Sequence, residues 1–200
     1  MTDEFEEKKE ALKFLERDFN QCFQQMRHYD SQIFEIFKFL FTLYTGLIGI
    51  SIGLYQFGIK ENIDFTPSSI AILLIGFLLG IFLFIVIVRN RAYFVQVTRY
   101  INEQRALFFK FEPLGFKNTS KMYTNSQKPN FFDRHCSQIW YLYVVALMNS
   151  ILIGVSIYIL YKNWIAIGIC FLLSSFAQMI YAYSYLKTRE NKTAEQAIFE

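Results

Sequence analysis

The first 57 residues constrain the fold more than any other stretch. Between residues 5 and 57, apolar side chains recur at steps of three and four, and no Pro or Gly interrupts them before Gly46. The apolar positions are Leu12, Leu15, Phe19, Cys22, Met26, Tyr29, Ile33, Ile36 and Leu40. One helix of this length would measure about 80 Å, whereas a bilayer core is only about 30 Å thick. Because residues 39–59 carry no charge and the preceding residues carry many, we expect a helix that begins in water and ends in lipid.

The composition agrees with a membrane protein. The 200 residues are 54% hydrophobic and include 23 phenylalanines and 13 tyrosines, which is unusual for a soluble domain. Four stretches are each long enough to cross a bilayer and contain no Asp, Glu, Lys, Arg or His: residues 39–59, 68–88, 139–161 and 164–186. We therefore predict an all-α integral membrane protein of four helices, built from two antiparallel transmembrane hairpins.

The basic residues predict the orientation. All but Lys60 and Lys162 of the 20 lysines and arginines lie before the first span, between the second and third spans, or after the fourth. The positive-inside rule then places both termini and the central segment in the cytoplasm, with the spans in the plasma (inner) membrane. The first apolar run follows about 35 charged and polar residues, so we expect it to act as the insertion signal, with no cleavable leader.

This topology divides the chain into five parts. Residues 1–38 form a cytosolic heptad helix continuous with the first span, and residues 39–88 form the first hairpin. Residues 89–138 form a cytosolic helix and loop, in which the helix continues from the second span to Pro113 and residues 114–130 are the loop. A third helix starts at residue 131. Residues 139–186 form the second hairpin, and residues 187–200 form a cytosolic C-terminal helix.

The two cytosolic helices should pair as a stalk. If the membrane boundary lies near Lys38 and Arg89, antiparallel pairing places Glu35 beside Arg91 or Ala92 and Asp30 near Arg99. The spacing also predicts an ion pair between Arg99 and Glu103, four residues apart on one helix. The arm of residues 1–38 carries nine acidic and six basic residues, and residues 89–138 carry nine basic and three acidic ones, so opposite charges favour docking.

One face of the second stalk helix is a candidate binding site. Arg91, Thr98, Asn102 and Arg105 share a side at helical spacing, with Arg99 alongside. This face is either solvated and ion-paired, or a receptor for an anionic ligand or a cytosolic partner protein, since guanidinium groups bind phosphate and carboxylate.

Small and polar residues within the spans indicate close helix packing. Pairs four residues apart occur at Gly49 and Gly53, at Gly76 and Gly80, and at Ser150 and Gly154; the fourth span has a stripe of Ala166, Cys170, Ser174, Gln178 and Ala182. Packing within one monomer is the favoured interpretation, and a seam in a homo-oligomer is the alternative. Asn149 and Gln178 lie at similar depths, so they either hydrogen-bond to each other as helix glue or line a polar constriction in an oligomeric pore.

No pattern indicates an enzyme. The chain has two histidines, three cysteines with no zinc-site spacing, no phosphate-binding loop and no nucleophile elbow, so we expect no catalytic residue, metal or cofactor. The excess positive charge of the central segment is expected to face anionic lipid headgroups of the bilayer. Nucleic acid is not an expected partner, because no recognised basic and aromatic module is present.

The layout resembles small multi-span membrane proteins of prokaryotic antiviral loci. These include the membrane accessory proteins of type VI-B CRISPR systems and the SLATT-like effectors. The similarity lies in the long polar helix before the first span and in the helix after the second, which carries Arg91, Tyr100, Asn102 and Arg105. It implies an oligomeric membrane effector or accessory protein that gates or perturbs the membrane after a cytosolic signal. The alternative is a non-catalytic membrane anchor or regulator of a cytosolic protein. The HEPN-like signature of some related accessory proteins is absent.

Overall fold

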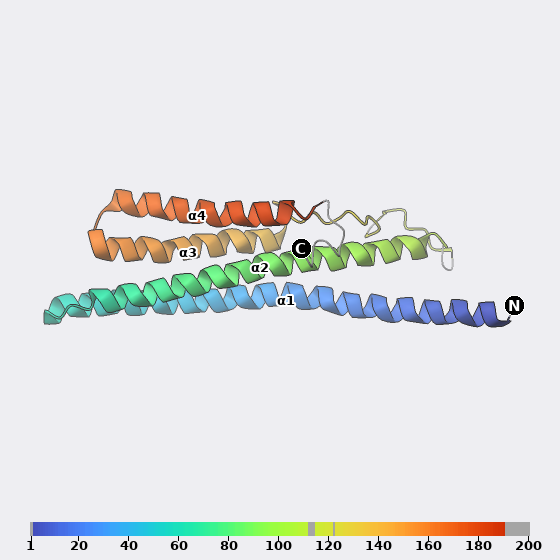
Figure 1. Ribbon diagram of the computed structural model, residues 1–200, viewed down its shortest axis with the longest axis horizontal. Helices are drawn as coiled ribbons and strands as arrows, with labels where there is room; N and C mark the ends of the chain where they lie inside the picture. Colours follow the sequence, from blue (N-terminus) through green and yellow to red (C-terminus); the bar gives the residue numbers. More distant parts are fainter. Residues whose placement is uncertain (1, 112–114, 122, 191–200) are drawn as a thin grey trace.

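The fold is all-helical over the part of the chain that the computed structural model describes, residues 2–111, 115–121 and 123–190. Its four helices are α1 (Thr2–Glu61), α2 (Thr66–Phe109), α3 (Ser137–Tyr161) and α4 (Trp164–Lys187) (Figure 1). All four are long and apolar enough to cross a membrane, as expected for a multi-pass membrane protein. The single helix predicted for residues 5–57 is confirmed, since α1 includes all of it.

Three predicted helix boundaries differ from the structure. α2 ends at Phe109, whereas the prediction continued this helix as far as the residue before Pro113. The third helix begins at Ser137 rather than at residue 131, because residues 131–136 form turns in which Asp133 accepts bonds from the backbone N–H groups of His135 and Cys136. α4 ends at Lys187 and residues 188–190 form a turn, so the predicted helix over 187–200 does not begin where expected; residues 191–200 lie outside the described residues.

The turn between α1 and α2 requires a glycine. Asn62 adopts a positive φ of 57°, and the N–H of Ile63 bonds back to the carbonyl oxygen of Gly58 at 3.0 Å. A Cβ at position 58 would lie 2.5 Å from the Ile63 oxygen, so a larger residue would force this closure apart. Pro67 then opens α2, at a position where its missing N–H costs no hydrogen bond.

The second hairpin is closed by two residues. Lys162 takes the left-handed conformation, and Asn163 caps α4 by accepting hydrogen bonds from the N–H groups of Ile165 and Ala166. Such a short connection forces α3 and α4 to lie side by side and antiparallel (Figure 1).

α2 lies at the centre of the molecule. It packs against α1 along its length and against α3 on its other side, while α4 contacts mainly α3 (Figure 1). The shared core contains Ile33, Leu40, Leu73, Phe84, Ile87, Val95, Ile139, Leu142 and Leu152, all buried. α3 and α4 cover only one half of the long α1–α2 pair, and the described loop residues, 115–121 and 123–136, run along α2 in the other half. The half of the pair that α3 and α4 do not cover, up to Asp30 in α1 and from Arg91 in α2, is called the rod below.

Candidate functional site

A polar network ties three helices together at mid-span. The Tyr44 hydroxyl of α1 donates to Oδ1 of Asn149 in α3, and the Asn149 amide donates to Oε1 of Gln178 in α4 at 2.6 Å. The Gln178 amide in turn donates to the Ser174 hydroxyl at 3.2 Å. The predicted bond between Asn149 and Gln178 is therefore confirmed. Tyr44 was missed, although a hydroxyl in the middle of an apolar span is itself a signal, because it needs a partner in lipid.

This network is closed within one chain. Asn149 is completely buried, and Ser150 both donates to the Ala146 carbonyl and accepts from Ser175. Its polar groups therefore hydrogen-bond to one another between helices of the same chain.

The glycines of the spans fall into two groups. A Cβ at Gly76 would meet Leu47, one at Gly80 would overlap Tyr44 and Asn149, and one at Gly154 would lie 3.3 Å from Ile167. These three glycines pack within the monomer. Gly49 and Gly53 have no other residue within 4 Å of an added Cβ, so the small-residue face of α1 is open.

Arg91 joins the rod to the spans. This residue is 1% exposed, and its guanidinium donates to the carbonyl oxygens of Asn130 (2.8 Å) and Phe131 (3.2 Å) and to Oε1 of Gln138 (2.8 Å). The Gln138 amide then donates to Asp30 of α1, so a glutamine links the buried cation to a carboxylate. Burial lowers the pKa of Arg91, and the nearby charges of Asp133 and Asp30 oppose that shift. One side chain thus connects α2 with the loop, with α3 and, through Gln138, with α1.

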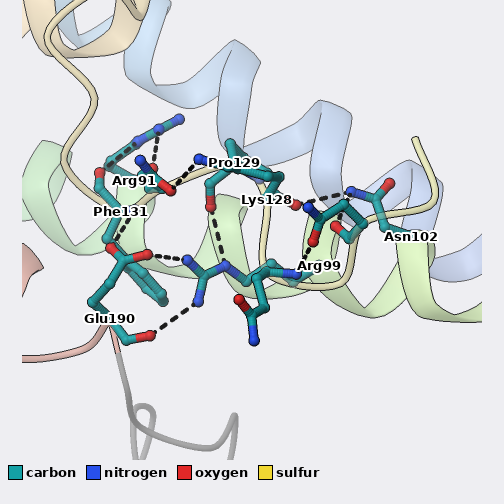
Figure 2. Close-up of polar contacts among 10 residues, drawn as sticks. Arg91, Arg99, Asn102, Lys128, Pro129, Phe131 and Glu190 are labelled. Atoms are coloured by element: carbon teal, nitrogen blue, oxygen red, sulfur yellow. Dashed lines mark hydrogen bonds and ion pairs between the residues drawn. The ribbon is translucent and has the colours of Figure 1, made fainter. Parts of the chain in front are cut away.

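Arg99 and Asn102 hold the same loop further along the rod (Figure 2). Arg99 donates to the Pro129 carbonyl at 3.0 Å and forms an ion pair with Glu190, whose other carboxylate oxygen accepts from the Phe131 N–H. The amide of Asn102 donates to the carbonyls of Asn125 and Lys128. The turn after α4 is therefore tied to α2 and to the loop.

The ion pairs predicted for the stalk, both between its two helices and within the second helix, are wrong. Arg99 pairs with Glu190 rather than with Asp30 or Glu103, Asp30 accepts from Gln138, and Glu35 pairs with Lys38 of its own helix. Observed contacts between Gln32 and Asn90, Tyr29 and Tyr93, and Asp18 and Gln104 all match residue n of α1 with residue 122 − n of α2. The predicted register aligned the first charged residue beyond each span, whereas the hairpin turn sets the observed one.

In the rod, α1 and α2 are joined by hydrogen bonds between uncharged side chains and by hydrogen bonds to Asp18. The Tyr100 hydroxyl and the Gln104 amide both donate to Oδ2 of Asp18, at 2.7 and 2.6 Å. The bond to Asp18 raises the pKa of Tyr100. Among the described residues no ion pair joins α1 to α2, so the arm does dock on the central segment, but through hydrogen bonds and apolar packing.

A cavity of about 790 Å³ lies between α1, α2 and the loop. Its lining comprises Phe23, Met26, Phe94, Thr98, Ile101, Asn102, Arg105, Lys121, Tyr123, Asn125, Lys128, Pro129, Asn130 and Asp133. Of the predicted stalk residues, Thr98, Asn102 and Arg105 therefore meet at one site. Arg91 instead donates to the loop and to Gln138, and Arg99 donates to the loop and to Glu190. The loop residues of the site were missed, because a polar loop carries no periodic signal of where it packs.

The described residues hold no group of three or more His, Cys, Asp or Glu side chains placed to bind a metal ion. Comparison with protein-family models, with curated proteins and with solved structures finds no match to this chain.

Proposed function

We propose that this protein is a non-enzymatic membrane effector that self-associates in the bilayer and couples a cytosolic signal at the rod to the packing of its spans. The resemblance of its layout to membrane proteins of prokaryotic antiviral loci supports a role in such a system. The buried Arg91 carries the proposal. It lies where the rod meets the four-helix part, and its contacts with the loop, Gln138 and, through that amide, Asp30 would transmit movement of the loop to α1 and α3.

Open helix faces support self-association. Gly49 and Gly53 leave an open small-residue face on α1 where another helix could approach closely, and of α4 only Gln178, Ala182 and Leu186 are buried. Because the mid-span amides are satisfied within the chain, any membrane opening would arise between copies rather than through one.

Induced expression in bacterial cells tests the effector. We expect depolarisation, read with a potential-sensitive dye, and a purified detergent complex whose mass is a multiple of the 23.7 kDa chain. Gly53→Leu should reduce both effects by filling the open face. Leu78→Ile, at an exposed position of α2 outside both of these open faces, is the control. An unchanged membrane potential under induction and under phage infection would reject the proposal.

A second function, an anchor for a soluble partner protein, is favoured by the end of the rod. A groove of about 510 Å³ there is lined by Leu12, Glu16, Phe19, Arg105, Phe108 and Phe109, and its Leu12 is 56% exposed. Exposed apolar surface of this kind is typical of protein contacts. The anchor predicts one partner that copurifies in fixed ratio from native cells and is lost on Leu12→Glu but retained with Ala11→Glu.

A further inference from the structure

The cavity of the rod has the dimensions and lining of a small-molecule site. At about 790 Å³ it lies within the range of natural ligand pockets, roughly 300–1,000 Å³. Phe23, Met26, Phe94 and Ile101 supply apolar walls, and the polar groups that converge on it come from α2 and the loop. Mostly apolar walls with a few placed polar groups are the usual design of such a site.

Arg105 offers its donors to this cavity. Its guanidinium lies 5.4 Å from the ring centroid of Phe19 and 5.3 Å from that of Tyr123, which fixes the position of the group. No side chain or carbonyl of the described residues accepts a hydrogen bond from it. Ring contacts leave the N–H edge of a guanidinium free, and that edge fits phosphate oxygens. Arg91 and Arg99 differ, because their donors are already occupied.

Asn102 provides an independent observation. This side chain is 3% exposed, and its amide nitrogen is used by two loop carbonyls. Its Oδ1, by contrast, has no hydrogen-bond partner among the described residues. A buried acceptor without a partner is costly and rare in folded proteins. An N–H donor on a ligand in the cavity would satisfy it.

Charge and position define the ligand further. The lining of the cavity contains three basic residues, Arg105, Lys121 and Lys128, and one carboxylate, that of Asp133. Glu16 lies in the adjoining groove rather than in the cavity, so the charge of the lining favours an anion. Arg105 follows Arg89, the first charge beyond the second span, by 16 residues. That is about 24 Å of helix, whereas the headgroup layer adds only about 5–8 Å to each side of the bilayer core. A soluble anion therefore reaches this cavity more readily than a lipid headgroup does.

We propose that the rod cavity binds a small soluble organic phosphate with a flat ring that carries an N–H donor, the chemistry of a nucleoside monophosphate. The phosphate contacts Arg105 and Lys121, the ring lies against Tyr123 and the apolar wall, and the N–H donates to Asn102 Oδ1. This inference rests on the proposed function for its consequence, because it names the chemistry of the cytosolic signal.

Titration calorimetry of the full chain in detergent tests the site. AMP and GMP are the probes, and adenosine and inorganic phosphate serve as the two separate halves of AMP. We expect saturable nucleotide binding that is at least about ten-fold tighter than either half, since each charge-assisted hydrogen bond is worth about that factor. Arg105→Gln and Lys121→Gln should each weaken it by about ten-fold. Arg134→Gln, an exposed arginine of the same loop outside the cavity, should bind as the unmodified protein does.

Three results would overturn the site: no saturable binding of either nucleotide, equal binding by Arg105→Gln, or phosphate binding as tightly as AMP.

A separate experiment uses phosphatidylglycerol and phosphatidylcholine vesicles. Arg105-dependent retention on the anionic vesicles that AMP fails to displace would assign the site to lipid and reject a soluble ligand. Binding in detergent requires no membrane activity. Nucleotide binding without depolarisation of cells would thus reject the effector alone, and depolarisation without binding would reject the site alone.

Discussion

At the scale of single residues, Arg91 shows how one buried charge is accommodated. Among the described residues its guanidinium forms no ion pair; it donates to two loop carbonyls and to Gln138, and the Gln138 amide in turn donates to Asp30. Removing such a group costs more than its own bonds, because every partner is left unsatisfied. The sequence marks Arg91 as a polar residue on an apolar helix, but it does not reveal that the partners come from residues 130–138.

Arg91→Leu should destabilise the junction by about 3 kcal/mol and release the loop, because two carbonyls and the Gln138 amide lose their donor. Limited trypsin digestion at Lys121, with thermal unfolding in detergent, measures both effects. Arg134→Leu removes an exposed arginine of the same loop and should change neither. Cleavage of Arg91→Leu at the unmodified rate would show that Arg91 does not hold the loop.

Gly80→Ala is a second test at this scale. The new methyl group would overlap the Tyr44 hydroxyl and the Asn149 amide, so we expect a loss of about 1–3 kcal/mol, typical of overpacking. Tyr44→Phe in the same chain removes one of the two overlapping groups and should recover part of the loss in a double-mutant cycle. Additive losses in thermal unfolding would instead indicate that position 80 and Tyr44 do not touch.

At the scale of elements, the register of the rod can be measured directly. Gln32→Cys with Asn90→Cys, in a chain whose three native cysteines are replaced by serine, should form an intramolecular disulfide with mild oxidant, because the two side chains are in hydrogen-bond contact. Asp30→Cys with Arg99→Cys represents the register expected from the charged boundaries and should crosslink far more slowly. The reverse order of rates would overturn the observed pairing.

The elements themselves were more predictable than their contacts. The length of α1 follows from local signals, an unbroken apolar seam and the absence of Pro, so residues 5–57 were correctly expected as one helix. Thr98, Asn102 and Arg105 were also found together, because helical spacing places them on one face. The rod register depends on the closure between Gly58 and Ile63, and the loop's path depends on Arg91, Arg99 and Glu190. Neither leaves a periodic trace in the sequence.

At the scale of the whole molecule, the helices of the rod continue without a break into the spans. The orientation of the chain in the membrane therefore decides which compartment, and which ligands, the rod is exposed to. α1 has 60 residues, about 90 Å of helix, of which a bilayer core accounts for about 30 Å. By the positive-inside rule, the basic residues of the loop and of the α2 part of the rod predict a cytoplasmic rod, with the two short hairpin turns on the outer side.

Labelling of single cysteines checks that direction. Glu10→Cys lies on the exposed surface of the rod and Glu61→Cys at the exposed end of the first hairpin, and neither change removes a basic residue. In intact cells a membrane-impermeant maleimide should modify position 61 at once and position 10 only after permeabilisation. Labelling of position 10 from outside would place the rod and its cavity in the exterior compartment. A cytosolic phosphate ligand could then no longer reach the cavity, even if the purified protein binds AMP.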